Sequence, residues 1–132
     1  MKKTTVCLLA VLMIFCVFCM PACGKYVSKF RAVACVHSNT TRQASLTYSD
    51  FTGTMVFKLK CKDGETLNYS GKVESGAVTV YYDDNGTKKE LFSVATGEEK
   101  TDSLQNPDSG TLYIIVESPE KSLNGDFSFS LQ

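Results

Sequence analysis

The chain has 132 residues, with 14 basic and 14 acidic side chains that give a formal net charge of zero. A balanced charge predicts no basic surface and argues against a nucleic-acid partner. Without the expected leader the chain has the length of one ordinary domain, and nothing in the composition defines an oligomeric state.

The first two dozen residues have the layout of a secretory signal peptide. Lys2 and Lys3 form a short cationic start, residues 6–20 are an almost unbroken apolar run, and small residues follow. The run of about 15 residues is shorter than the roughly 20 that a membrane-spanning helix needs. We therefore expect residues 1–22 to be removed, and residues 23–132 to work outside the cytoplasm as a single domain.

The leader ends in Met20-Pro21-Ala22-Cys23, which resembles the lipobox of bacterial lipoproteins, although Leu and then Ala or Ser are usual at the first two positions. The resemblance implies that Cys23 becomes the first mature residue and carries diacylglycerol. Two acyl chains make a stable anchor, so the domain would stay on the outer face of the cell membrane. In an alternative interpretation, cleavage after Gly24 releases a soluble, secreted domain.

Six cysteines reduce to two in the mature domain. Three leave with the leader and Cys23 takes the lipid, so Cys35 and Cys61 remain. Two cysteines in an exported domain can form only one disulfide. Closing that loop of about 26 residues would stabilise the fold by roughly 3–4 kcal/mol. The alternative is a pair of buried free thiols.

Side chains for catalysis or metal binding are scarce. His37 is the only histidine, so a Cys/His metal site lacks ligands and a nucleophile lacks an obvious base. No serine lies in a Gly-x-Ser-x-Gly elbow. Acidic residues cluster in expected turns and not as the facing pair of a glycosidase. We expect no cofactor, no metal and no catalytic residue, hence a protein that is not an enzyme.

From Tyr26 onward, apolar and polar residues alternate between turn signals, which is typical of β-strands. In the first half we expect strands at residues 27–37, 44–48, 55–61 and 67–73. A polar loop covers residues 38–41. The Asp63-Gly64 pair between two alternating runs predicts a hairpin, because both residues tolerate positive φ.

The second half repeats this pattern, with expected strands at residues 78–82, 91–94, 112–116 and 127–131. Turns are expected at residues 74–76, 83–86 and 124–125, and residues 96–110 form the longest polar loop. Asp83 and Asp84 could offer oxygen ligands to calcium, but a tight turn needs no ion. About eight short strands, each with one buried face, predict an antiparallel β-sandwich, with a closed barrel as the alternative.

The segment from Gly76 to Leu131 resembles the C-terminal part of small extracellular β-sandwich modules of the bacterial pre-peptidase type. The shared pattern is a glycine before an alternating strand, a turn glycine, a Gly-x-Tyr-x-Ile-x-Val strand and a closing Phe-x-Phe strand. Here it is carried by Gly76, Gly86, residues 110–116 with one extra residue, and residues 127–129. The resemblance implies a sandwich with an accessory or adhesive role, and it transfers no catalytic residue.

The candidate ligand platform is a tyrosine, because tryptophan is absent. Tyr81 and Tyr82 are adjacent, so one of them points inward and the other outward. We take Tyr82 as the possible platform for a glycan. The expected function is that of a membrane-anchored extracellular lipoprotein with a non-catalytic binding or accessory domain. The alternative is a secreted carbohydrate-binding module. The sequence does not identify the protein or glycan partner.

Overall fold

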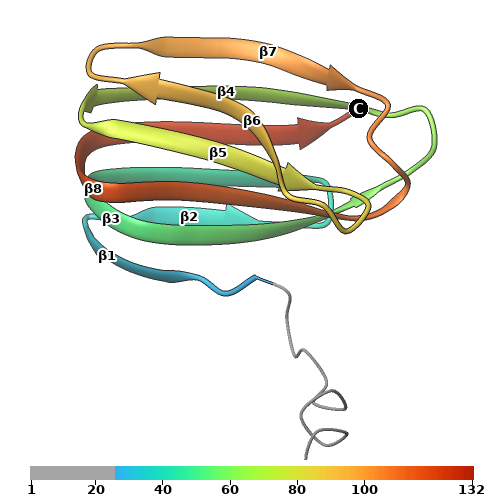
Figure 1. The fold of residues 1–132 in the computed structure, drawn as a ribbon, viewed down its shortest axis with the longest axis horizontal. Coiled ribbons are helices and arrows are strands. Elements are labelled where there is room, and N and C mark those ends of the chain that lie inside the picture. The colour runs from blue at the N-terminus through green and yellow to red at the C-terminus, as the bar shows by residue number, and fades with distance from the viewer. Residues whose placement is uncertain (1–25) are drawn as a thin grey trace, which may run out of the picture.

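The computed structural model describes residues 26–132, and every regular element in that range is a β-strand (Figure 1). The strands are β1 Lys29–Val33, β2 Val36–Asn39, β3 Gln43–Cys61, β4 Thr66–Ser75, β5 Ala77–Asp83, β6 Lys89–Ala95, β7 Glu99–Gln105 and β8 Gly110–Leu131. Within the described range there is no helix capable of crossing a membrane. The leader, its cleavage point and Cys23 lie outside the described residues.

Two long strands organise the fold. β3 and β8 pair antiparallel along nearly their whole length, and both bend midway. In Figure 1, β8 runs across the molecule, turns at one end and returns towards the C-terminus. Layer 1 contains β2, the first half of β3, the second half of β8, β4 and β7; layer 2 contains β1, the second half of β3, the first half of β8, β5 and β6. The expected antiparallel β-sandwich is confirmed.

The bend occurs where backbone and side chains allow a sharp corner. On β3 the pairing register shifts between Phe51 and Gly53, and Gly53 has φ 120°. A Cβ at Gly53 would lie 2.3 Å from the carbonyl oxygen of Lys29, so only glycine fits. On β8 the corner lies at residues 118–122, where Ser118 and Ser122 are fully buried. Strands that change layer at such a bend are a known way to close a sandwich.

The core lies between the two layers and contains the inward-facing residues of each strand. Four phenylalanines on the two long strands β3 and β8 are almost completely buried: Phe51, Phe57, Phe127 and Phe129. The rings of Tyr69 and Phe92 stack across the layers with centroids 4.9 Å apart. Burial of each such side chain contributes about 1.5–3 kcal/mol, so this aromatic core is the main source of stability.

Several expected boundaries are wrong. The expected strand at residues 27–37 is two strands, because Ala34 adopts φ 50° and breaks the run. Two expected pairs, 44–48 with 55–61 and 112–116 with 127–131, are the single bent strands β3 and β8. Asn124-Gly125 is therefore inside β8 and is not a tight turn. The expected loop at residues 96–110 contains β7, whose edge position lets it form from a polar sequence.

The two strong turn signals have different roles. Residues 83–86 form the expected hairpin, since β5 and β6 pair directly. Asp63-Gly64 also forms a turn, but β3 and β4 do not pair; the turn carries the chain from layer 2 to layer 1. The predicted hairpin there is wrong, because the turn chemistry that reverses a strand serves equally well between layers.

The expected disulfide is also absent: Cys35 and Cys61 are free thiols. Cys35 lies beside Tyr48, since its neighbour Val36 pairs with Thr47. The two halves of β3 run back from the bend in facing layers, so distance from the bend measures position along the sandwich. Tyr48, beside Cys35, lies four residues from the bend and Cys61 lies nine. The two cysteines are therefore about five residues, or roughly 17 Å, apart along the strand direction. That exceeds the approximately 7 Å that a disulfide spans between Cα atoms.

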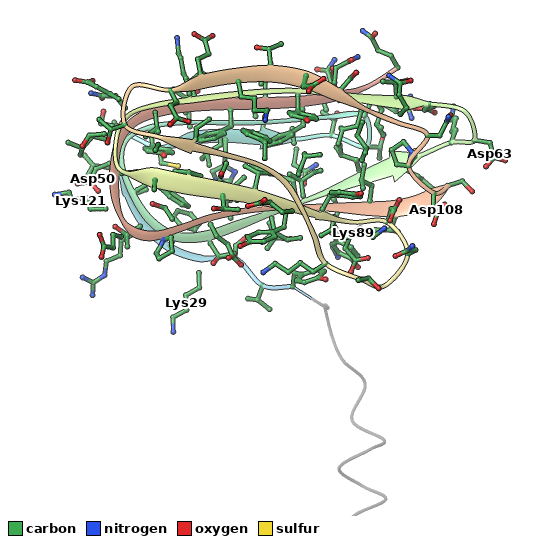
Figure 2. The ribbon with its side chains drawn as sticks, turned by 45° about the horizontal axis from the view of Figure 1, so that its top comes forward. Lys29, Asp50, Asp63, Lys89, Asp108 and Lys121 are labelled. Carbon is green, nitrogen blue, oxygen red and sulfur yellow. The ribbon has the colours of Figure 1, made fainter. Side chains whose placement is uncertain are left out.

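Charged side chains mark the two ends of the sandwich (Figure 2). Asp50 and Lys121 form an ion pair of 2.9 Å at the corner end. Asp63 and Asp108 lie at the opposite end, where Cys61 is buried. Burial raises the pKa of both the Cys35 and the Cys61 thiol. These thiols are therefore kept protonated and weakly nucleophilic.

Candidate functional site

The outer face of layer 1 is covered by short polar side chains. Leu67 and Tyr69 point into the core, so the alternation of β4 turns Asn68 and Ser70 outward. The same alternation applies on β3 and β8, and pairing with β4 places Thr101 and Ser103 of β7 beside Ser70 and Asn68. We call the resulting surface the serine face; its residues are Ser45, Asn68, Ser70, Thr101, Ser103, Ser128 and Ser130.

Register aligns these groups in rows across the strands. Ser45, Ser128, Ser70 and Thr101 pair successively from β3 to β7, and the next row contains Gln43, Ser130, Asn68 and Ser103. Neighbouring strands are about 4.8 Å apart, so each row is a ladder of hydrogen-bonding groups. Within it the Ser70 and Ser128 hydroxyls are 2.9 Å apart.

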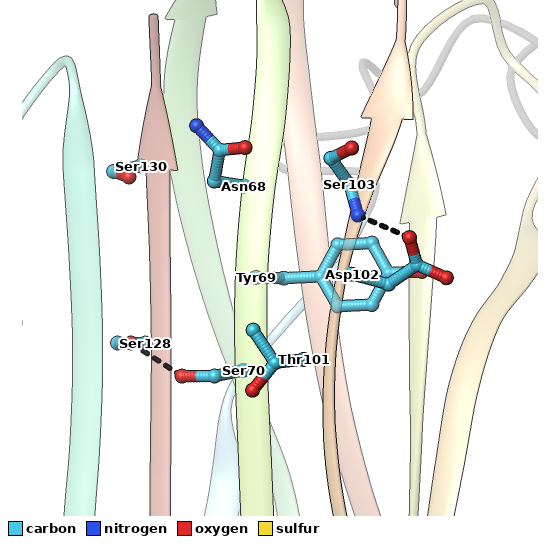
Figure 3. Close-up of a pocket in the computed structure, with 8 residues that line it drawn as sticks. All are labelled: Asn68, Tyr69, Ser70, Thr101, Asp102, Ser103, Ser128 and Ser130. Carbon is cyan, nitrogen blue, oxygen red and sulfur yellow. Dashed lines mark hydrogen bonds between the residues drawn. The ribbon is translucent and has the colours of Figure 1, made fainter.

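The short side chains leave a hollow between β4, β7 and β8 (Figure 3). Its volume is about 420 Å³, and its lining includes six members of the serine face together with Tyr69 and Asp102. Asp102 is the one ionisable carboxylate in that lining, and it accepts a hydrogen bond from the backbone N–H of Ser103 at 2.8 Å. The hollow is therefore polar and almost uncharged.

The Tyr69 side chain belongs to the core beneath this surface. It is only 7% exposed, and in Figure 3 its ring extends from β4 towards β7. Burial, with a smaller contribution from the negative charge of Asp102, raises the pKa of its hydroxyl. Tyr69 therefore stays a neutral phenol under the hollow, and the ring does not form an exposed stacking surface.

A smaller hollow of about 140 Å³ continues the surface along the same strands. Ser70 and Ser128 line both hollows, and Lys72, Glu99 and Asp126 add charge to the second. The polar surface therefore extends beyond the first hollow and becomes charged at one end.

The predicted platform, Tyr82, does not lie on an outer face. It follows Val78 and Val80 on the inward side of β5 and packs, partly buried, against the core. The Lys89 ammonium nitrogen lies 5.4 Å from its ring centroid. Its neighbour Tyr81 points outward, with the Lys88 ammonium 4.2 Å from its ring centroid. Adjacent strand residues face opposite sides, so Tyr82 packs against the core and Tyr81 is the tyrosine of this pair on the outer face.

The other candidates have structural roles. The Asp83 carboxylate accepts hydrogen bonds from the N–H groups of Asn85 at 3.2 Å and Gly86 at 2.6 Å, which holds the turn. Across residues 26–132, no group of three His, Cys, Asp or Glu side chains is arranged to hold a metal ion. His37 is exposed on β2, where its ring packs edge-on against Phe30 with centroids 6.4 Å apart.

Sequence reasoning missed the serine face because the alternation of apolar and polar residues was used only to find the buried positions, and the polar positions between them were not considered as a site. The polar positions of residues 67–73 and 127–131 alternate with the apolar ones that predicted the strands. Only the pairing of β4 with both β7 and β8 shows that their serines lie side by side.

No family model and no curated protein matches the chain. Several solved structures have a similar fold. The periplasmic inhibitor PliG of Aeromonas hydrophila, which inhibits g-type lysozyme, has a TM-score of 0.50 at 20% identity, covering 70% of this chain and 88% of that one. The module TmCBM61, in complex with β-1,4-galactotriose, has a TM-score of 0.43 at 18% identity and covers 67% and 70%. A family 29 carbohydrate-binding module complexed with mannohexaose has a TM-score of 0.39 at 16% identity and covers 80% and 91%. At these identities the similarity concerns the fold alone.

Proposed function

We propose that this chain is a non-catalytic, lipid-anchored extracellular domain that binds a glycan chain on its serine face. The observation that carries the proposal is the hollow of about 420 Å³, where hydroxyl and amide groups from β4, β7 and β8 converge. A secreted, unanchored form of the same domain is the alternative.

The chemistry of the hollow suits a polyhydroxylated ligand. Hydroxyl and amide side chains both donate and accept hydrogen bonds, as sugar hydroxyls do. Pockets for drug-like molecules are instead mostly apolar and enclosed. The surface here is open and continues into the second hollow, so it suits an extended chain.

We expect the interaction to be modest in strength. The serine face contains no aromatic side chain among its seven defining residues, so stacking on a sugar ring contributes nothing there. Each net hydrogen bond contributes only about 0.5–1.5 kcal/mol, because water competes for the same groups. Selectivity would then come from the pattern of hydroxyl and amide groups along the strands.

Binding is tested with the full-length protein on a glycan array, followed by calorimetry on the best ligand. Replacing both Ser70 and Ser128 by valine removes two adjacent hydroxyls and keeps residues that favour strands. We expect at least a tenfold loss of affinity, equivalent to about 1.4 kcal/mol. Ser93→Val is the matched control, since Ser93 is an exposed strand serine on β6 in layer 2. Unchanged binding in the double variant would refute the site.

Anchoring is supported by the leader, in which Cys23 follows the apolar run after Pro21 and Ala22. Mass spectrometry of the mature protein from its native host tests this part separately. We expect an N-terminal Cys23 whose mass includes diacylglycerol. An unmodified chain that begins at Lys25 would exclude the anchor and leave the secreted alternative.

A further inference from the structure

The outer face of layer 2 differs chemically from the serine face. Tyrosine and lysine side chains predominate on it, and we call it the tyrosine–lysine face; its residues are Tyr26, Lys58, Lys60, Tyr81, Lys88 and Tyr113. Beneath them Ile115 is only 1% exposed, although it points away from the core. Its partners on the neighbouring strands are Val56 on β3 and Tyr81 on β5.

The N-terminal end of the described chain is bound to this face. The Tyr26 hydroxyl donates a hydrogen bond of 2.6 Å to the Asp83 carboxylate. The Tyr26 ring packs edge-on against Tyr113 with centroids 5.3 Å apart. Close by, the Ser28 hydroxyl accepts a hydrogen bond of 2.8 Å from the N–H of Val56. Residues 26–28 therefore lie against layer 2 and do not extend freely from it.

A lipid at Cys23 would be tied closely to this contact. Cys23 and Tyr26 are three residues apart in the sequence, and three residues span at most about 11 Å. We propose that the tyrosine–lysine face rests on a bilayer surface that contains anionic lipids; this inference depends on the lipid anchor proposed above. The short tether and the bound Tyr26 together leave the domain little freedom to turn this face away.

The side chains of this face suit the headgroup region. Tyrosine combines an apolar ring with a polar tip and is enriched at membrane interfaces. Lysine stems lie along apolar surface while the ammonium group reaches anionic headgroups. Within the described part of the chain, Lys58 and Lys60 take part in no ion pair, whereas Lys88 pairs with Glu117 at 2.6 Å. Val27 is 70% exposed beside Tyr26 and adds an apolar contact.

This orientation has a consequence for binding. The two faces are the opposite outer surfaces of the sandwich, so seating layer 2 on the membrane turns the serine face towards the extracellular medium. A ligand could then reach the hollow between β4, β7 and β8 without passing the bilayer.

The test uses the absence of tryptophan from the chain. Full-length lipidated protein with Tyr81→Trp is reconstituted into vesicles of phosphatidylcholine and phosphatidylglycerol at about 7:3, with lipids brominated near the headgroup. We expect at least twofold quenching of tryptophan fluorescence. Thr101→Trp on the serine face is the control and should be quenched little. Thr111→Trp, exposed on β8 beside Lys60, is a second reporter if Tyr81→Trp fails to fold.

The outcomes separate this inference from the proposed function. Protein that fails to float with the vesicles would refute the anchor and the orientation together. Protein that floats but shows equal quenching at positions 81 and 101 would refute the orientation and leave the anchor intact. Reversing charge with Lys58→Glu and Lys60→Glu should lower the quenching at position 81 on anionic vesicles. Unchanged quenching in that variant would contradict the role of anionic headgroups.

Discussion

At the scale of single residues, a buried hydroxyl network holds the corner of the sandwich. Ser122 lies 2.7 Å from the Tyr48 hydroxyl and donates a hydrogen bond of 3.2 Å to the carbonyl oxygen of Phe51. Ser118 donates to the Glu120 carbonyl at 2.5 Å and lies 3.2 Å from Ser122. Every buried side-chain polar atom in residues 26–132 has a partner, so the bend in the two long strands carries no desolvation penalty from an unpaired side chain.

This network predicts that Tyr48→Phe destabilises the fold. Loss of the Tyr48 hydroxyl leaves a buried Ser122 with one partner fewer, and we expect a cost of about 1–2 kcal/mol. Tyr69→Phe is the matched control: the Tyr69 ring is also in the core, but its hydroxyl is not fully buried and makes no hydrogen bond to the described residues. Urea denaturation measures both variants. Equal losses would show that the Tyr48 hydroxyl contributes nothing specific.

The Arg42–Glu65 ion pair makes stability depend on pH. The hydrogen bond from Arg42 holds the pKa of Glu65 below its ordinary value, with help from the charge of Arg42 and the N–H of Lys62. Because the folded-state pKa is the lower one, the stabilisation is complete above the unfolded pKa of about 4.3. It is lost as pH falls through the folded pKa.

We therefore expect Glu65→Gln to lower the melting temperature at pH 7 and to make it less sensitive to acid. The difference between wild type and variant should shrink as pH falls towards 3. Glu98→Gln is the control, since Glu98 is exposed in the turn after β6 and forms no ion pair within residues 26–132. Thermal melts from pH 3 to pH 7 measure the effect, and parallel curves for wild type and Glu65→Gln would contradict it.

At the scale of elements, a glycine allows the long strand β3 to bend and the edge strand β1 to pack against it. Gly53 combines a positive φ with direct contact to the backbone of β1. Gly97 has φ 77° in the connection from β6 to β7, but a Cβ there would meet nothing within 4 Å. Comparing substitutions at Gly53 and Gly97 therefore separates the cost of backbone strain from the cost of a steric clash.

We expect Gly53→Ala to cost more than about 3 kcal/mol, because strain at positive φ adds to overpacking against β1. Gly97→Ala should cost only about 1–2 kcal/mol, the penalty for a left-handed alanine. Chemical denaturation of the two variants gives the comparison. If the two losses are equal, the contact between Gly53 and β1 does not matter for stability.

The sequence predicts the strand content well and the connections poorly. Alternation locates Leu67, Phe127 and Phe129 on the inner face, because one buried face imposes a period of two. It misses β7, whose polar residues at the sheet edge carry no such alternation. It also divides β3 and β8: the residues left between the expected strands 44–48 and 55–61 contain the bend at Gly53, and the expected turn at Asn124-Gly125 lies inside β8 beyond its corner.

At the scale of the whole molecule, the candidate sites depend on pairings that no local pattern contains. Tyr82 was chosen from its type and its neighbour, and register places it inward. The serine face and the tyrosine–lysine face each collect residues from strands far apart in sequence, such as Ser70 with Ser128 and Lys58 with Tyr113. Alternation shows which residues of a strand lie on the same side. Which outer face of the sandwich they belong to depends on the layer of that strand, and the layer is a tertiary property.

Because the two faces are on opposite layers, we expect them to act independently. Face-to-face packed sheets are about 10 Å apart, and effects at sites without shared partners usually add to within about 0.3–0.5 kcal/mol. Lys58→Glu with Lys60→Glu should therefore leave glycan affinity within about twofold of wild type. Ser70→Val with Ser128→Val should leave vesicle quenching at position 81 unchanged. Calorimetry and fluorescence on the combined variants measure both effects. A change of more than about threefold in glycan affinity from the layer 2 variant alone would mean that the bent strands β3 and β8, which run through both layers, transmit strain between the faces.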